Sequence, residues 1–555
     1  MTRNTPYYIY TRARFLLASL LLLQITVCTK AQDFGLFTQS TPCPKRELRA
    51  VWLTTLFGLD WPKTRATDTS SRQQQQRELC QILDQLKAAN INTIFLQTRI
   101  RGTVIYPSAI EPWDGALTGA IGRDPGYDPL AFAIEETHRR GMELHAWIVT
   151  IPCFKIAVVR QMGAKSVLKT HPELCRKHGD TYYLDPGLPG TADYLLRICH
   201  EIISHYDVDG IHFDYIRYPE GASSFNDAAT FKKYAAKGQS KAVWRSNNIT
   251  RIVRRIYEDT HQLKPWVRIS SSPVGKYADV SRFSSRGWNA RDAVHQDAQG
   301  WLRQGIHDML FPMMYFDGNH FYPFAADWQE HSSQRFVAPG LGIYFLHPQE
   351  KNWPLSTITR QLHYVRQQGL AGQAYFRSKF LTDNVKGLYD YLRQDFYAFP
   401  ALPPACTWLD SIAPPVPKNL KLRTTSFGQT ELVWEDGRST ETTEASSLRY
   451  NVYASTSWPV DISRPENLVA TLLPQSHFSF DPVYTALSRL HLAVTAVDRC
   501  GNESTAIQLS SSGNSTCTPK LDWNSNGLSR SLIIRPQTTA QKKKKESGRK
   551  KKRKR

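Results

Sequence analysis

Residues 209–219 read DGIHFDYIRYP, and this stretch decides how the rest of the chain is interpreted. Ile211 and Phe213 alternate with His212 and Asp214, which is the period of two expected of an extended strand. One face of the strand is apolar, and the polar face ends in a carboxylate. An aspartate after a strand is most often a turn or helix-capping residue, so a chemical role for Asp214 needs the context of the whole chain.

Seven further stretches of this kind lie between residues 47 and 400. Most follow an amphipathic helix, such as segment 73–90 with Leu79, Leu83 and Leu86 on one face. The seven strand-like stretches are residues 49–55, 91–101, 142–149, 265–273, 307–316, 335–345 and 369–377. Eight strands in this length predict a parallel (β/α)8 barrel, a TIM barrel, over 47–400. A doubly wound open sheet is the alternative, and the lack of a glycine-rich phosphate loop counts against it.

The composition changes after residue 400. Residues 401–415 are proline-rich and predict a linker. Short alternating strands over 416–510 predict a small all-β sandwich, and this module resembles a fibronectin type III domain. Residues 511–555 are rich in Ser, Thr and Asn and then in Lys and Arg, so we expect a disordered basic tail. A chain of 555 residues is long enough for these two domains.

The two ends of the chain carry much of its charge. Residues 1–31 hold a basic start and an apolar run too short to span a membrane, which predicts a signal peptide, with a linker at 32–46. Cys28 could instead be lipidated, although the residues before it match that signal poorly. The formal net charge is +21, of which residues 541–555 contribute 10. We expect an exported protein of the periplasm or cell envelope, whose tail attracts anionic envelope polymers and not nucleic acid.

The strand alternation also predicts which side chains line the barrel mouth, where TIM barrels bind their substrates. The apolar residues of three strands suit the helix-facing side, so the opposite set faces inward: Gln97, Arg99, His145, Trp147, His212 and Asp214. An acid for proton transfer, groups that hydrogen-bond hydroxyls and aromatic faces are the equipment of a carbohydrate site. A structural network that ties the strand ends together is the plainer alternative. The nine cysteines show no zinc-like spacing, and Cys500 could pair with Cys517. We expect no metal and no cofactor.

Several long blocks in order resemble the glycosyl-hydrolase-like family ten. They include RAVWLTTLFGLDWP, NTIFLQTRIRGTVIYPSAIEPWDGALTG, YYLDPGLP and YDVDGIHFDYIRYP, and the resemblance covers most of 47–380. It implies a TIM barrel that cleaves glycosidic bonds, and one envelope branch is similar to divisome glycosidases that cut peptidoglycan glycan strands. By position, the resemblance makes Asp214 the general acid. It implies substrate-binding roles for Arg49, Trp52, Asp60, Trp61, Gln97, Arg99, Trp113, His145, Trp147 and Tyr218, to which we add His212, Arg217 and Tyr315.

A second carboxylate is harder to assign. Glycoside hydrolysis normally uses two, about 5–5.5 Å apart for retention or about 6.5–9.5 Å apart for inversion. The candidates are Glu111, Asp317 and Asp60, and each also fits a turn or a loop anchor, Asp317 above all. Where many relatives have a second acid after Asp214, this chain has Tyr215. An N-acetyl group on the substrate could serve as the nucleophile instead.

The prediction is therefore an exported glycoside hydrolase that acts on an envelope or environmental glycan, with peptidoglycan glycan strands as one candidate. Two alternatives stay open. One is a non-catalytic glycan-binding barrel that has lost a carboxylate. The other is a surface scaffold that docks through its C-terminal module and tail.

Overall fold

The computed structural model describes most of the chain between residues 42 and 533. The described ranges are 42–281, 283, 288–426, 429–438, 448–480, 489–511, 520–525 and 528–533. The predicted signal peptide with Cys28, Cys517 and the basic segment 541–555 lie outside them. Among the described residues, no helix has the length and apolarity needed to cross a membrane.

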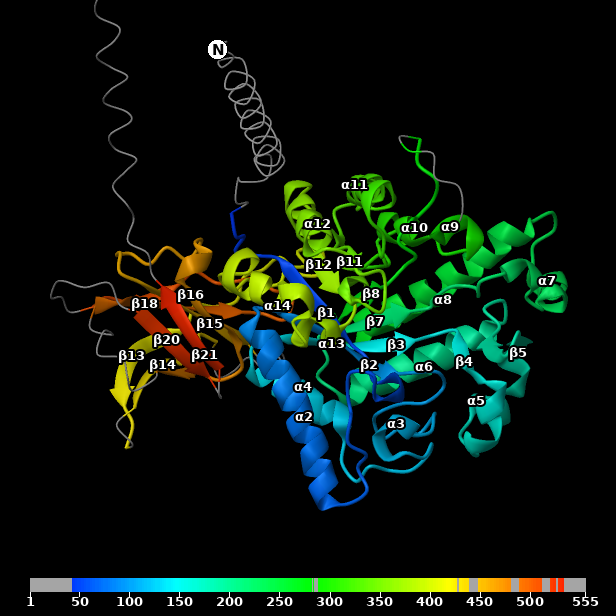
Figure 1. The fold of residues 1–555 in the computed structure, drawn as a ribbon, viewed down its shortest axis with the longest axis horizontal. Coiled ribbons are helices and arrows are strands. Elements are labelled where there is room, and N and C mark those ends of the chain that lie inside the picture. Colours follow the sequence, from blue (N-terminus) through cyan, green and yellow to red (C-terminus); the bar gives the residue numbers. More distant parts are fainter. Residues whose placement is uncertain are drawn as a thin grey trace, which may run out of the picture. The chain divides into compact units, whose positions relative to one another are not determined.

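Nine strand segments form one parallel sheet that closes on itself (Figure 1). They are β1 (Leu48–Leu53), β2 (Thr93–Arg99), β3 (Glu143–Val149), β7 (Gly210–Asp214), β8 (Arg268–Ser271), β9 (Met309–Leu310), β10 (Phe336–Val337), β11 (Gly340–Leu341) and β12 (Gly372–Tyr375). β10 and β11 are consecutive segments of the chain that together occupy one strand position. β10 pairs with β9, and β11 pairs with β12. Because β12 also pairs with β1, the sheet closes into an eight-stranded barrel, as predicted.

Helices alternate with the strands, as a (β/α)8 fold requires. The connecting helices are α2 (Thr69–Ala88), α4 (Pro129–Arg139), α6 (Pro189–His205), α8 (Lys241–Leu263), α10 (Ala298–Arg303), α11 (Tyr322–Glu330) and α12 (Leu355–Gln367). Their ends follow local sequence: the Asp128 side chain caps α4 by accepting from two backbone N–H groups, and Pro129 occupies the first turn.

Shorter elements belong to the loops between strands and helices. They are α3 (Gly115–Thr118), α5 (Val167–Thr170), α7 (Ala228–Tyr234), α9 (Ala290–Ala293), α13 (Ser378–Thr382), α14 (Leu388–Tyr391) and a small antiparallel sheet of β4 (Pro152–Lys155), β5 (Cys175–His178) and β6 (Thr181–Leu184). The small sheet is inserted after β3, so it belongs to the end of the barrel where that strand finishes.

The barrel strands separate two cores. The outward set, which includes Val51, Ile94 and Ile211, packs against the helices. The inward set fills the barrel with Ala50, Trp52, Phe95, Trp147, Met309, Phe311 and Ala338 among others. This separation confirms the alternation that the sequence predicted for β2, β3 and β7.

Two antiparallel sheets follow the barrel. One contains β13 (Lys418–Thr424), β14 (Thr430–Glu435) and β17 (His477–Ser479), and the other contains β16 (Leu468–Leu473), β15 (Arg449–Ser455), β18 (His491–Val497) and β19 (Ile507–Leu509). They share a core that includes Trp434 and Tyr450. The resemblance of this module to a fibronectin type III domain stays a prediction. Within the stretch expected to be disordered, β20 (Lys520–Ser525) and β21 (Leu528–Ile533) form an antiparallel pair.

The proline-rich stretch that we expected to be a linker is packed in its first half. Leu402 and Cys406 are buried, and the Cys406 N–H donates to the carbonyl of Cys500. The Trp408 indole donates to Asp308 at the amino end of β9 over 2.7 Å. This segment therefore lies against the amino-terminal end of the barrel and does not act as a free spacer there.

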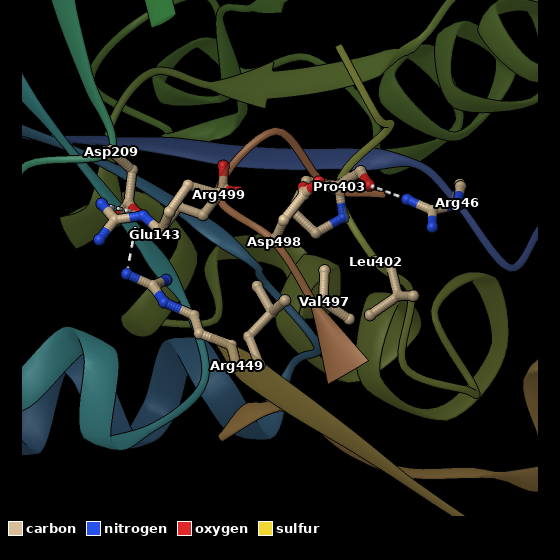
Figure 2. A pocket seen from close by; sticks show the side chains of 11 residues that line it. Arg46, Glu143, Asp209, Leu402, Pro403, Arg449, Val497, Asp498 and Arg499 are labelled. Atoms are coloured by element: carbon tan, nitrogen blue, oxygen red, sulfur yellow. Dashed lines mark hydrogen bonds and ion pairs between the residues drawn. The ribbon is translucent and has the colours of Figure 1, made fainter. Parts of the chain in front are cut away.

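A buried charge network centred on Asp209 joins the barrel to the C-terminal module at this same end (Figure 2). The Asp209 carboxylate accepts from Arg449 of β15 at 2.9 Å, from Arg499 at 3.2 Å and from the Leu144 N–H at 2.8 Å. The Nε2 atom of His138 lies 2.7 Å from Oδ2 of Asp209, the oxygen that also accepts from the Leu144 N–H. Burial raises the pKa of Asp209, but the neighbouring positive charges more than offset this and hold it well below its usual range.

The cavity beside this network has a volume of about 10 Å³, space for one water molecule at most. A sugar ring does not fit there. TIM barrels bind their substrates at the carboxyl ends of the strands, so that end is described next.

Candidate functional site

Asp214 is the last residue of β7, at the carboxyl-terminal end of the barrel. Its side chain is buried, with 7 % of the residue exposed. One carboxylate oxygen accepts from the Tyr215 N–H at 2.8 Å and the Ser272 hydroxyl at 3.2 Å, and the other accepts from the Trp147 indole at 3.3 Å. Three donors from β3, β7 and the end of β8 therefore fix the orientation of this carboxyl group.

The protonation of Asp214 follows from two opposing influences. Burial raises its pKa, whereas the Arg217 charge and the three hydrogen bonds lower it, and burial prevails. A carboxyl group with a raised pKa keeps its proton to higher pH than an exposed aspartate, which is the property that a general acid needs.

Aromatic side chains surround Asp214 at this end of the barrel. Tyr215 follows it directly with a positive φ of 53° and is 37 % exposed. The Tyr315 ring, from the loop after β9, stacks on Phe376 at 5.4 Å and meets Tyr344 edge-on at 5.8 Å. Burial and the Asp214 charge raise the pKa of Tyr315, which places its hydroxyl in the field of that carboxylate. Flat rings beside a proton donor suit a sugar substrate.

Arg217 lies in the same group, two residues after Tyr215. Its guanidinium is 4.8 Å from the centre of the Tyr215 ring and 5.0 Å from that of Trp288, which is 42 % exposed. The predicted neighbours Trp147, Arg217 and Tyr315 are thus all brought to Asp214, and their role in binding stays a prediction.

The two inward histidines lie deeper in the barrel than Asp214. His212 accepts from the Trp52 indole at 3.0 Å, contacts Ser270 at 2.9 Å and stacks on Phe95 at 4.1 Å. Burial lowers the pKa of His212 well below its usual range, so it is neutral. His145 is fully buried beside the same Phe95 ring. The structure therefore places Trp52, His145 and His212 in the barrel interior, beneath the site.

Arg99 and Glu111 form a buried ion pair on the outer side of the barrel. The Arg99 guanidinium donates two bonds to Glu111 at 2.8 and 2.7 Å, and the Tyr194 hydroxyl of α6 donates a third at 2.8 Å. Neither side chain of the pair is exposed. The prediction that Arg99 lines the mouth is wrong, because the pairing of β2 with β3 slips between Gln97 and Arg99 and reverses which way the later residue points.

Glu111 forms no described contact with Asp214. Its three hydrogen bonds hold it under the loop after β2, and its role as the second catalytic carboxylate stays a prediction. Gln97, before the slip, points as predicted but anchors the loop after β1: its carbonyl oxygen accepts from the N–H groups of Thr55 and Leu56 at 3.1 and 2.8 Å.

Three other predicted residues are also buried away from the site. Arg49, near the amino end of β1, pairs with Glu47 at 2.9 Å and donates to the Phe399 carbonyl. Trp61 packs in the outer core, and its indole donates to α2 at 2.8 Å. Tyr218 packs against α8, where Asn248 donates to its hydroxyl over 3.3 Å. Bulky aromatic and arginine side chains that look functional in the sequence here serve packing.

The remaining predicted residues lie in loops. Trp113 is partly buried against the outer core in the loop after β2. Asp60 accepts from the Thr54 N–H at 2.8 Å and forms an ion pair with Arg377, so it ties together the loops after β1 and β12. Asp317 is exposed at the start of the turn 318–320, which agrees with the alternative prediction that it is a turn residue. Neither acid forms a described contact with Asp214.

Sequence reasoning missed several residues at this end of the barrel. Ser272 belongs to a run of three serines that shows no alternation, and its bond to Asp214 depends on the closing of the barrel. Trp288 and Phe376 lie in loops far apart in the sequence. Glu220, on the loop after β7, is exposed, and its charge acts on Tyr215.

One group of residues has a spacing that could hold a metal ion. Asp327, Glu330 and His331 on and just after α11 bring their ligand atoms within 4.8 Å of one another. Asp327 also accepts from Gln299 at 2.9 Å. Two of the three are exposed, and exposed acidic groups are common without any metal, so this cluster does not bear on the site around Asp214.

A closed parallel barrel with helices between its strands defines the protein as a TIM-barrel protein. Asp214 lies at the end of the fourth strand, where proteins of this fold bind their substrates. Residues 47–339 match the family Glycosyl hydrolase-like 10. The chain belongs to this family, which confirms the family resemblance seen in the sequence.

Two curated relatives are similar over long stretches. The glycosyl hydrolase YngK of Bacillus subtilis (strain 168) is 29 % identical over 490 residues, covering 83 % of this chain and 92 % of YngK. The glycosyl hydrolase DigH of Escherichia coli (strain K12) is 35 % identical over 296 residues, covering 50 % of this chain and 67 % of DigH. Among solved structures, the glycoside hydrolase domain of PgaB (BpsB) from Bordetella bronchiseptica aligns with a TM-score of 0.43 and 14 % identity, covering 62 % of this chain and 98 % of that chain.

Proposed function

We propose that this protein is a glycoside hydrolase in which Asp214 protonates the leaving-group oxygen of a glycosidic bond. The observation that carries the proposal is the buried Asp214 carboxyl group, fixed by three hydrogen-bond donors and raised in pKa, with aromatic rings beside it. The family name and the two curated relatives, both described as glycosyl hydrolases, point to the same class of reaction.

The second catalytic group is supplied by the substrate in this proposal. Glu111 and Asp60 are held in ion pairs, and Asp317 is an exposed turn residue. An N-acetylated sugar can use the oxygen of its own acetamide group as the nucleophile, so a single protein acid is enough. In this proposal Tyr315, whose hydroxyl lies in the field of Asp214, orients that sugar.

The substrate that fits this chemistry is an N-acetylated glycan of the cell envelope, with peptidoglycan glycan strands as the first choice. The predicted signal peptide at 1–31 supports export to such a compartment, where the basic tail would attract anionic polymers. The C-terminal module, anchored to the barrel through Asp209, would then travel with the catalytic domain as one unit.

A non-catalytic glycan-binding barrel is the second candidate. Three acids were candidates for the second catalytic carboxylate beside Asp214. Two of them, Glu111 and Asp60, are held in ion pairs, which favours a barrel that binds glycans without cleaving them. Such a protein would bind the same glycans and release no product.

Reducing-end release from peptidoglycan glycan strands and from chitin oligosaccharides tests the proposal. We expect turnover by the full-length chain, a loss of about 10²- to 10⁴-fold in Asp214→Asn and no comparable loss in the matched control Asp317→Asn. Binding without any product favours the second candidate. Turnover that survives in Asp214→Asn would refute the assignment of the acid.

A further inference from the structure

The guanidinium of Arg217 is buried without a hydrogen-bond partner for its Nε atom. Only 4 % of the residue is exposed, and no described residue accepts a bond from Nε. A buried donor without a partner bears the full cost of losing its water, and this cost is higher for a charged group. Its presence beside the proposed acid therefore needs an explanation beyond packing.

The Nε edge of the Arg217 guanidinium has no acceptor among the described residues, and the Nε atom itself is buried. The Tyr215 and Trp288 rings lie 4.8 and 5.0 Å from it and hold the group by cation–π contacts. Among the described residues, no carboxylate forms an ion pair with it, and its charge reaches Asp214 only through space. The guanidinium is thus held in place by rings and still lacks an anion.

A second arginine lies at the same end of the barrel. Arg101, in the loop after β2, is partly exposed and has no ion pair among the described residues. The charges of Arg101 and Arg217 both act on the hydroxyls of Tyr183 and Tyr215. The carboxylates of Asp180, Asp214 and Glu220 act on the same two tyrosines, so this part of the site carries charges of both signs.

We propose that Arg217 forms a subsite for a carboxylate carried by a sugar ring of the substrate. The proposal rests on the proposed function and specifies it: the preferred glycan is acidic. The Nε edge of a guanidinium presents two parallel N–H donors, and a planar carboxylate matches this geometry better than any neutral sugar group does. The exposed rings of Tyr215 and Trp288 are then available to the apolar face of the same sugar.

The subsite also couples binding to the acid. In the ligand-free protein the Arg217 charge lowers the pKa of Asp214. A carboxylate bound to Arg217 neutralises part of that charge, so the pKa of Asp214 rises when an acidic glycan occupies the subsite. Asp214 is consequently a better-populated proton donor with an acidic substrate than with a neutral one.

Calorimetric binding to the full-length Asp214→Asn chain tests the subsite without turnover. The probes are glycan fragments of peptidoglycan without stem peptides, the same fragments after chemical reduction of their carboxylates to alcohols, and oligogalacturonides. We expect reduction to weaken binding about 10- to 100-fold, the worth of a charged hydrogen bond. Arg217→Gln in the same background should abolish this difference, and Arg217→Lys should retain part of it.

The control is Arg77→Gln on the exposed face of α2, which should leave the ratio of the two affinities unchanged. If only the affinity for peptidoglycan fragments depends on Arg217, the subsite binds a carboxylate attached to the sugar through an ether. If the affinity for oligogalacturonides also depends on Arg217, the subsite binds ring carboxylates in general. Equal binding of intact and reduced fragments, or an Arg217→Gln variant that keeps the difference, overturns the subsite. The proposed function then still stands if the natural chain releases reducing ends from the same glycans. No binding of any glycan overturns both.

Discussion

Replacing Glu111 with leucine removes one half of a fully buried ion pair and leaves the Arg99 guanidinium without its main acceptor. The carboxylate accepts three hydrogen bonds, from Arg99 twice and from Tyr194 once, and neither partner of the ion pair is exposed. If Glu111 is structural, the variant should lose stability while each folded molecule keeps its turnover.

The size of the loss follows from these contacts. Breaking a buried ion pair by removing one partner costs about 3–5 kcal/mol. Arg99 keeps its bonds to the carbonyls of Val149 and Thr150, so the loss is expected near the lower end, about 3 kcal/mol. The double variant Arg99→Met with Glu111→Leu removes both charges, so its free energy of unfolding should lie closer to that of the natural chain. We expect a remaining loss of about 1 kcal/mol for each carbonyl that no longer has a donor.

Urea unfolding of the full-length chain measures the stability, and reducing-end release per folded molecule measures the turnover. Glu135→Leu on the exposed face of α4 is the matched control, expected within about 0.5 kcal/mol of the natural chain. A Glu111→Leu variant with unchanged stability and lost turnover would refute this reasoning and return Glu111 to the chemistry.

Two further substitutions have effects whose direction follows from the structure. Arg217→Gln removes a charge that lowers the pKa of Asp214 in the free protein, so the alkaline limb of the kcat/KM–pH profile should move to higher pH; an unmoved limb contradicts their coupling. Asp209→Asn should cost about 3–5 kcal/mol at pH 7 because Arg449 and Arg499 lose their buried partner. The pKa of Asp209 is depressed in the folded state, so its stabilisation is present above the unfolded pKa of about 3.9 and lost as pH falls through the folded value. The stability difference between the two chains should therefore shrink in acid, and a difference independent of pH would count against the charge network.

The fold was predictable because period-two and helical patterns report local burial directly. All eight predicted strands are present in the barrel, and the alternation on β3 and β7 correctly placed Trp147 and Asp214 on the inward face. These predictions succeed because each depends only on a side chain's position within its own strand.

Residues that depend on irregular backbone or on distant partners were not predictable. A single slip in the pairing of β2 turned Arg99 outward. Whether Glu111 faces a substrate or an arginine is decided by that slip and by Tyr194 of α6, neither of which the sequence pattern reveals. Ser272 likewise reaches Asp214 only because β8 lies next to β7 in the closed barrel.

The role of Asp214 as a proton donor is tested most directly by changing how much the leaving group needs a proton. Asp214→Asn should be compared with the natural chain on the natural glycan and on a dinitrophenyl glycoside with the same glycone, whose leaving group departs without protonation. We predict a loss of about 10²- to 10⁴-fold on the glycan and little loss on the dinitrophenyl substrate. Equal losses on both substrates would contradict the assignment of Asp214 as the general acid.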